Sequence, residues 1–232
     1  NVLDIVHKND PGNVGDLYPS PVSSQNQFRG LNETLWEILQ AAGFGALLAF
    51  DPVSGLKILS ASGKEQRVAL QASDLPLGNQ STKLADLIDI HRIATEFSGF
   101  RVALLIDYAS HLNGPDSENL EEFFVAVDLA SRQQRYLESR SQQNPTFWIV
   151  DYPADLPDWF VQNNALLREV QVEVPNLEDR FWFARHLAGA LDWLAGEDEA
   201  QAERLLQQFA LACDGKPLVA MDAIAKITDA EG

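Results

Sequence analysis

The sequence has little of several features that would point to particular classes of protein. Its 232 residues include a single cysteine, Cys213, so no disulfide can form within the chain, and no His and Cys residues are spaced as zinc ligands. No apolar run reaches the roughly 18 residues that a bilayer-spanning helix needs, and the N-terminus lacks the basic and then apolar pattern of a signal peptide. We therefore expect a soluble protein of a reducing, cytoplasmic compartment.

Positive charge is scarce as well. Lys and Arg number 17 against 34 Asp and Glu, which gives a formal net charge of −17 at pH 7. A surface this acidic repels the phosphates of nucleic acids and the headgroups of anionic lipids, so neither nucleic acid nor a membrane is an expected partner. The apolar share of 46% and the charged share of 22% are those of a globular protein with a sizeable core. The length suits one large domain with a small appendage.

The first thirty residues show no sustained periodicity. Asn, Asp, Pro, Gly and Ser are frequent from Asn1 to Gly30, after a short apolar start. This composition predicts an extended arm or linker over residues 1–30, which gains burial only by lying across its own domain, a neighbouring subunit or a partner. Because residue 1 is Asn and the only methionine is Met221, we also expect this numbering to begin inside a longer coding sequence.

After the arm, the apolar pattern alternates between helical and strand periods. Helical spacing predicts helices over residues 31–42, 82–97 and from 120 onward. Strand patterns fall at residues 45–50, 56–60, 101–107, 146–151 and 168–174, the first two with turn residues between them and a hairpin as one option. Strands that alternate with helices predict an α/β fold, a three-layer sandwich around a mainly parallel central sheet.

The end of the sequence predicts only helices. Asn176 is placed to cap a helix that runs to Leu187, and helical patterns follow from Ala188 onward. A helical group after an α/β core indicates a small lid-like subdomain. The expected organisation is therefore a core over residues 31–175 and a helical subdomain over residues 176–232.

The order of elements between residues 101 and 187 resembles the second half of a AAA+ ATPase core. One buried strand ends at Asp107, a second ends at Asp151, and a third precedes the stretch from Pro175 to Arg180. In AAA+ proteins the corresponding strands end in two acidic residues, the Walker B element, and in an Asn, called sensor 1. Arginine fingers, a further strand, a PxxxxR-type turn and a helical lid follow. The resemblance implies a AAA+-like core with its lid.

The residues that carry the chemistry in active relatives differ here. By the resemblance, Asp107 matches the Walker B Asp, which holds Mg²⁺ through water, but Tyr108 stands where the Glu would polarise the attacking water. A phenol with a pKa of about 10 is a poor general base at neutral pH. Asp151 stands in place of the sensor 1 Asn, and a carboxylate there would repel a γ-phosphate. These positions are interpreted as degenerate.

Arginine fingers and a phosphate-binding loop are missing from the same pattern. The finger positions match Gln162 and Ala165, with only Arg168 nearby. The nearest approach to the phosphate loop G-x-x-x-x-G-K-[ST] is the stretch 55–65, where Lys64 precedes a Glu. We interpret this stretch as a polar turn after a strand. No catalytic residue, nucleotide, metal or other cofactor is therefore expected in this chain.

Other polar residues have a functional and a structural interpretation. Asp107, Asp151 and Asp155 could gather at the carboxyl end of the sheet, where open α/β sheets bind ligands, or could only cap the loops that follow the strands. We favour a structural role over a catalytic or ligand-binding one for four isolated residues: His91, Ser110, His111 and Cys213.

Aromatic residues near the ends of predicted elements are candidates for a protein interface. Trp159, Phe160 and Trp182 fall at loop or helix edges, where an exposed patch would mark an interface and a buried one would be core. AAA+ relatives assemble side by side, with the lid of one subunit against the core of the next. The resemblance therefore adds Arg180, beside Trp182, as a candidate contact residue.

Three functions from different classes remain open. The first is a catalytically inactive AAA+-like domain of a larger AAA+ ATPase, which binds a protein partner, other domains of the same polypeptide, or copies of itself in an oligomer. The second is an active NTPase whose phosphate-binding loop lies outside this chain or is not recognisable in it. The third is an unrelated α/β enzyme or small-molecule binder that uses the carboxylates at the strand ends.

Overall fold

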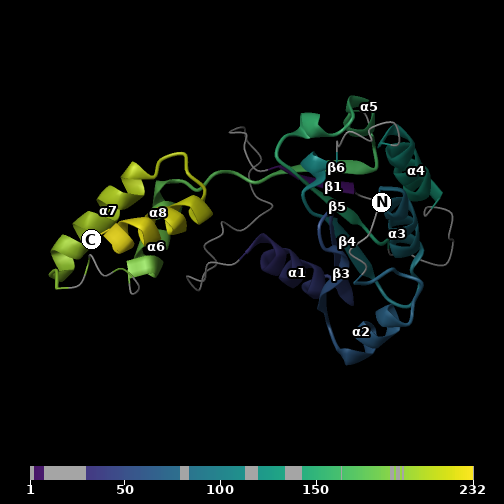
Figure 1. The fold of residues 1–232 in the computed structure, drawn as a ribbon, viewed down its shortest axis with the longest axis horizontal. Helices are drawn as coiled ribbons and strands as arrows, with labels where there is room; N and C mark the ends of the chain where they lie inside the picture. The colour runs from purple at the N-terminus through teal and green to yellow at the C-terminus, as the bar shows by residue number, and fades with distance from the viewer. Residues whose placement is uncertain are drawn as a thin grey trace. The chain divides into compact units, whose positions relative to one another are not determined.

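The computed structural model describes residues 3–7, 30–78, 84–112, 120–133, 143–162, 164–188, 191, 194 and 196–231. Its helices and strands, drawn in Figure 1, are β1 (Leu3–His7), α1 (Leu31–Ala41), β2 (Ala46–Asp51), β3 (Gly55–Ala61), α2 (Lys64–Gln71), α3 (Leu84–Glu96), β4 (Val102–Ile106), η1 (Ala109–His111), α4 (Leu120–Gln133), β5 (Thr146–Val150), η4 (Pro153–Asp155), α5 (Asp158–Val161), β6 (Leu167–Gln171), α6 (Leu177–Leu187), α7 (Glu199–Ala212) and α8 (Leu218–Glu231). Here η1 and η4 are short 3₁₀ helices.

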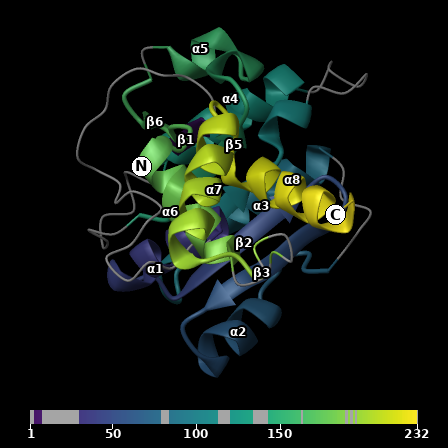
Figure 2. The ribbon, with the colours of Figure 1, turned by 90° about the vertical axis from the view of Figure 1, so that its left-hand side faces the viewer.

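Six strands form one sheet in the order β3-β2-β4-β5-β1-β6. Strand β3 runs antiparallel to β2 and the other pairs are parallel, so the described sheet is mainly parallel. The β2–β3 turn is held by the carboxylate of Asp51, which accepts the amides of Val53 and Ser54 at 3.0 and 2.6 Å. The hairpin can be followed in Figure 2. The α/β sandwich predicted from the sequence is confirmed.

The inner strands are buried on both faces, as their continuous apolar runs predict. Along β4, Val102, Leu104 and Ile106 pack into the core beneath α3, α4 and α5, whereas Ala103 and Leu105 pack against α1. Figure 1 shows these helices on opposite faces of the sheet. Because alternate residues of one strand point to opposite faces, the run needs apolar side chains at every position.

Trp148 on β5 lies at the centre of the larger core layer. It is fully buried, and its ring centroid lies 5.8 Å from Phe123, 5.5 Å from Phe124 and 5.8 Å from Phe160. These rings come from α4 and α5, so one residue joins the sheet to two helices. Aromatic contacts of this kind contribute beyond the area that they bury.

Asn144 connects the end of α3 with the start of β4. Its buried side chain accepts the amide of Val102 at 3.0 Å and donates to the carbonyls of Ala94 and Phe97 at 3.0 and 2.9 Å. The last carbonyls of a helix have no partner within the helix, so an amide side chain that reaches them replaces water. Asn144 thereby fixes where α3 ends and β4 begins.

The structure differs from the expected arm at its start. Residues 3–7 form β1, which pairs in parallel with β5 on one side and with β6 on the other. The polar composition of the first thirty residues hid this inner strand. Residues 8–29 lie outside the described part of the chain. Helix α2 has no counterpart among the predicted elements either, because only Leu70 is buried on it and its apolar pattern is weak.

Contacts divide the chain into two units: among the described residues, the first contains 3–7 and those from 31 to 172, and the second contains Gly30 and those from 173 onward. Helices α6, α7 and α8 belong to the second. The predicted cap at Asn176 is confirmed, because its side chain accepts the amide of Asp179 at 3.0 Å while the Asp179 carboxylate accepts the amide of Asn176 at 3.2 Å. Of the helices in the described residues, none combines the length and the apolar sequence of a membrane-spanning segment.

Candidate functional site

The loop after β4 begins with Asp107 and Tyr108 at the carboxyl edge of the sheet. The amide of Asp107 donates to the carbonyl of Phe50 at 2.9 Å, and its carboxylate accepts the amide of Tyr108 at 3.0 Å. Tyr108 has φ 55° and ψ 35°, the only positive φ outside glycine in the described residues. This left-handed conformation costs an ordinary side chain about 1–2 kcal/mol. The phenol is 59% exposed and its ring centroid lies 6.2 Å from that of His111.

Asp151 lies in the next loop along the same edge, after β5. Its amide donates to the hydroxyl oxygen of Ser110 at 2.7 Å, which ties η1 to the start of this loop. One residue further on, the amide of Tyr152 donates to the carboxylate of Asp155 at 2.8 Å. The structure therefore brings residues 107–108 and 151, which the resemblance matches to Walker B and sensor 1, together at one edge. It gives Ser110 and Asp155 hydrogen bonds that hold the loops.

The aromatic residues between Tyr152 and Phe160 divide into core and surface. Phe160 is fully buried, with its ring centroid 4.8 Å from Phe124, so the expectation that Phe160 belongs to an interface is wrong. Its neighbour Trp159 is 46% exposed, and Tyr152 is 56% exposed. Helix α5 is short and packs only one face against the core, so one of these two neighbouring rings is buried and the other is exposed.

The charge on these loops is negative. Asp107, Asp151, Asp155 and Asp158 lie in them, and neither residues 107–112 nor residues 151–162 contain a Lys or Arg. Within the described residues, no three His, Cys, Asp or Glu side chains come together as metal ligands would. The carboxylates that the third hypothesis requires share an edge, yet the open hollow described below is lined by other residues.

The stretch nearest in sequence to a phosphate loop lies at the other edge of the sheet. Gly63 and Lys64 follow β3, and the last residue of β3, Ala61, pairs with Ala46 at the start of β2. The turn after β3 is therefore at the amino edge of the parallel strands, whereas Asp107 is at their carboxyl edge. Lys64 is exposed at the first turn of α2.

Strand β1 is not among the strands that the sequence predicts, and its place in the sheet bears on where a ligand would bind. The chain leaves β1 toward α1 and then β2, and leaves its neighbour β5 toward α5 and then β6, on opposite faces of the sheet. Neighbouring strands whose connections diverge in this way mark the point where open α/β sheets bind ligands. A phosphate loop would follow His7. The sequence there, residues 8–16, contains Gly12 and Gly15 but no Gly-Lys-Ser or Gly-Lys-Thr, and it lies outside the described residues.

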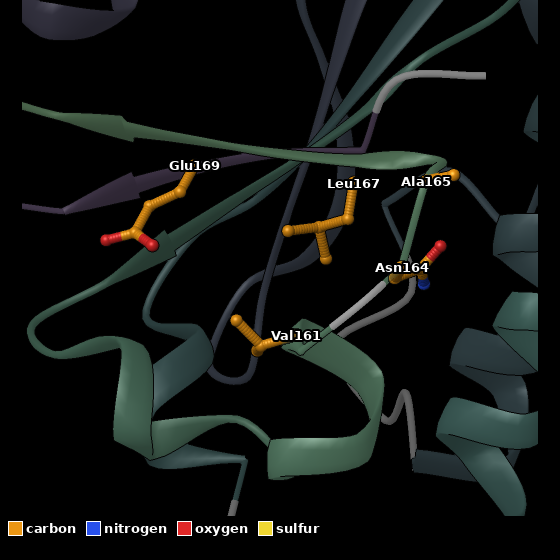
Figure 3. A pocket seen from close by; sticks show the side chains of 5 residues that line it. All are labelled: Val161, Asn164, Ala165, Leu167 and Glu169. Atoms are coloured by element: carbon orange, nitrogen blue, oxygen red, sulfur yellow. The ribbon is translucent and has the colours of Figure 1, made fainter. Parts of the chain in front are cut away.

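The arginine-finger positions lie on and around the turn between α5 and β6. An open hollow of about 410 Å³ is lined there by Val161, Asn164, Ala165, Leu167 and Glu169. In Figure 3 the side chains of Val161 and Leu167 point toward one another across it. Ala165 thus lies at the hollow, while Gln162 and Arg168 are exposed beside it. The lining of the hollow is mixed: Val161, Ala165 and Leu167 are apolar, Asn164 is polar and Glu169 is charged.

In the second unit, Arg180 is buried and not on a contact surface, so that part of the interface expectation is wrong. Its guanidinium donates to the carbonyls of Ala210 at 3.0 Å and Pro175 at 2.8 Å and pairs with Asp214 at 2.8 Å. These bonds tie the start of α6 to the end of α7. Trp182 is half-buried on α6.

Two titratable side chains whose pKa is shifted are buried, His91 in the first unit and Cys213 in the second. Burial raises the pKa of the Cys213 thiol, against the opposing effect of Arg180 and Lys216. Burial lowers the pKa of His91 to about 4, and its Nε2 has no hydrogen-bond partner among the described residues. Both groups are therefore neutral at pH 7.

The family model that matches the sequence agrees with this architecture. A family model described as AAA+ chaperone, N-terminal Rossmann-like domain, matches residues 11–173. Among solved structures, that of the FIGL-1 AAA domain in complex with ADP is similar over 60% of this chain, with 12% identity and a TM-score of 0.39; the match spans 41% of that chain. No curated protein matches the sequence. Because the family model covers well over half of the residues, the chain belongs to the family of N-terminal Rossmann-like domains of AAA+ chaperones.

Proposed function

We propose that this chain is a domain of a larger AAA+ protein that does not itself hydrolyse ATP and that serves protein binding or assembly. The observation that carries the proposal is Tyr108, an exposed side chain at the position where the resemblance expects a catalytic Glu. A phenol does not accept a proton from water at neutral pH at a useful rate. The family description, which names a domain of AAA+ chaperones, supports the larger protein.

The charge at the carboxyl edge also supports a domain without hydrolysis. Phosphoryl transfer depends on cations that neutralise the β- and γ-phosphates and the charge that develops between them. The loops after β4 and β5 offer Asp107, Asp151 and Asp158 and no Lys or Arg within residues 107–112 and 151–162. Two like charges 4 Å apart near a protein surface repel by about 4 kcal/mol, so a triphosphate is disfavoured at this edge.

The wider part of the proposal concerns the whole protein. ATP hydrolysis would belong to a domain outside this sequence, and the partners would be proteins, other domains of the polypeptide, or further copies within a AAA+ assembly. A cytoplasmic location fits the single free cysteine, Cys213, which is buried. No cofactor is part of the proposal.

ATP binding and turnover by this chain test the proposal. We expect no turnover with Mg²⁺ above the rate of a blank and no heat of ATP binding in calorimetry at micromolar concentrations. Tyr108→Glu restores the carboxylate alone, so it is expected to remain inactive, with Val53→Glu on the β2–β3 turn as a matched exposed control. Micromolar ATP affinity, or turnover gained by Tyr108→Glu and not by the control, would contradict the proposal.

A second candidate, an active NTPase with an unrecognised phosphate loop, is favoured by one observation. Strand β1 stands at the divergence of the chain connections, and glycines follow it at Gly12 and Gly15. Residues 8–16 contain no Ser or Thr, and their one lysine, Lys8, precedes both glycines instead of following them, which weighs against this candidate. Calorimetry separates the two candidates, because the second predicts binding of ATP by the unmodified chain.

A further inference from the structure

The two outermost strands of the sheet differ in what lies beside them. On the outer side of β3, Leu56 forms a bridge with Leu77, and the amide of Gly78 donates to the carbonyl of Leu56 at 2.9 Å. Strand β6 pairs with β1 on its inner side, and none of the described residues pairs with its outer side. Alternate residues of an edge strand point their N–H and C=O groups away from the sheet. The outer side of β6 therefore carries a row of backbone donors and acceptors.

The two faces of β6 differ in their side chains. Leu167 packs against the larger core layer, and because side chains alternate along a strand, Glu169 and Gln171 share its face. In Figure 3, Leu167 and Glu169 leave the strand on the same side. Arg168 and Val170 belong to the opposite face. The carboxylate of Glu169 is therefore the only charge that β6 places on the face beside α5.

The open hollow lies along this same face. Leu167 and Glu169, which are alternate residues of β6, line it together with Val161, Asn164 and Ala165 from the end of α5 and the turn that follows. In sites that accept an added strand, the free backbone edge provides affinity, and pockets for alternate side chains provide specificity. The outer side of β6 and the hollow provide these two features side by side.

The carboxylate of Glu169 has no cation beside it in the described part of the chain. The side chain is exposed, and it takes part in none of the ion pairs that the described residues form. On neighbouring strands, opposite charges that face one another are favourable and like charges are unfavourable. A strand added to β6 should therefore carry a basic side chain opposite Glu169.

A second copy of this chain does not supply that basic side chain. Two copies joined at their β6 edges in the antiparallel manner place side chains of the same face opposite one another. On the face of Glu169, β6 offers only Leu167 and Gln171 besides the carboxylate itself. The net charge of −17 on each copy also opposes association. We therefore look for the occupant in a different protein.

We propose that the outer side of β6 binds an extended segment of a partner protein as an added strand, and that in this segment Lys or Arg alternates with β-branched apolar residues. The backbone of the segment pairs with β6, and one basic side chain lies opposite Glu169. The aliphatic stem of the next basic side chain on that face covers Val161 and Leu167 at the hollow. The β-branched residues favour a strand and pack beside Val170 on the other face. The inference rests on the proposed function, whose protein partner it specifies.

Fluorescence anisotropy with labelled decapeptides tests the inference on the whole chain. The probes are alternating Lys-Val, Lys-Gly and Glu-Val peptides. We expect the Lys-Val peptide to bind most tightly, and the Lys-Gly peptide about ten-fold more weakly because glycine disfavours a strand and has no side chain to pack. The Glu-Val peptide should not bind. Equal affinity for the Lys-Val and Lys-Gly peptides would overturn the inference and leave only the net charge of −17 as the cause.

A charge reversal at Glu169 tests the position of the segment. Glu169→Lys should weaken the Lys-Val peptide about five-fold and allow the Glu-Val peptide to bind. Glu197→Lys, at an exposed loop residue of the second unit, changes the net charge equally and is the matched control, which should keep the affinities of the unmodified chain. Equal weakening of the Lys-Val peptide by both variants would refute the placement beside Glu169.

Hydrogen exchange tests the added strand itself. The Lys-Val peptide should slow exchange of the backbone amides in a peptic fragment that covers residues 166–172, and should leave a fragment that covers β3 unchanged. Exchange in β4 and β5 without peptide shows whether Glu169→Lys is folded. If bound peptide protects β3 instead, or protects neither edge strand, the inference is wrong.

The same samples distinguish failure of this inference from failure of the proposed function. Absence of ATP turnover together with absence of Lys-Val selectivity refutes only the added strand. ATP turnover refutes the proposed function whatever the peptides do. Sedimentation of the unmodified chain as a dimer that Glu169→Lys dissociates would also overturn the inference, because a second copy would then occupy the edge.

Discussion

His91 gives the first unit a stability that depends on pH in a way that can be calculated. The residue lies on α3 among buried apolar neighbours, and its Nε2 has no hydrogen-bond partner in the described residues. Burial disfavours the imidazolium and lowers the pKa from 6.5 to about 4. We predict that replacing His91 with Leu, a side chain of similar volume, reduces the loss of stability on mild acidification.

The sign and size follow from linkage between protonation and folding. The folded pKa lies below the unfolded one, so the stabilising effect is complete above pH 6.5 and is lost as the pH falls toward 4. At pH 5.5 about 90% of unfolded chains but only about 3% of folded chains carry a proton on His91. The unmodified chain should therefore lose roughly 1.3 kcal/mol more than His91→Leu between pH 7.5 and pH 5.5.

Hydrogen exchange as a function of urea, read in peptides that cover β4 and β5, measures the first unit separately from the second. The quantity compared is the change in unfolding free energy between pH 7.5 and pH 5.5, in His91→Leu and in the unmodified chain. His111→Gln, which also removes one imidazole but an exposed one, is the matched control and should behave as the unmodified chain. An identical pH dependence in His91→Leu would refute the reasoning.

Two further substitutions test the hydrogen bonds that join elements. Asn144→Ala removes three hydrogen bonds and leaves their backbone partners unsatisfied, so it should lower the unfolding free energy by about 3 kcal/mol. The control Asn164→Ala, at a more exposed position, should lower it by about 1 kcal/mol. Urea denaturation measures both changes. Arg180→Met leaves two carbonyls of the second unit without their donor, and should speed hydrogen exchange in α6 and α7, whereas Arg185→Met on the exposed face of α6 should not. Equal effects of Asn144→Ala and Asn164→Ala, or of the two Arg variants, would contradict these assignments.

The elements that could be predicted from the sequence are those whose pattern is strong over a short range. Strands β4 and β5 are runs buried on both faces, and Asn176 caps α6 through a local box of bonds. Both signals depend only on residues next to one another in the chain. The short helix α2 is not predicted, because Leu70 is its only buried residue and few apolar residues mark the helix in the sequence.

The residues of the candidate site could be predicted from the sequence more fully than the exposure of their side chains. The strand ends at Asp107 and Asp151 place two loops at one edge, which the resemblance anticipates. Exposure cannot be read in the same way: Trp159 and Phe160 are neighbours of similar apolar character, yet one is 46% exposed and the other is fully buried. The rotation of the short helix α5 decides which ring faces Trp148, and that rotation depends on tertiary packing.

Strand β1 shows why sheet order matters more to function here than element type. Its five residues pair with β5 and β6, whose nearest residues lie about 140 positions later in the sequence, so no local pattern connects them. Because β1 lies between those strands, the connections that leave β1 and β5 diverge just after His7. A phosphate loop would therefore follow His7. Such a loop would lie in residues 8–16 and not around Lys64, which is at the opposite edge of the sheet. Because that stretch also lacks a Gly-Lys-Ser/Thr sequence, a phosphate loop is missing at the position where this sheet order requires one, which supports the proposal that the chain does not hydrolyse ATP.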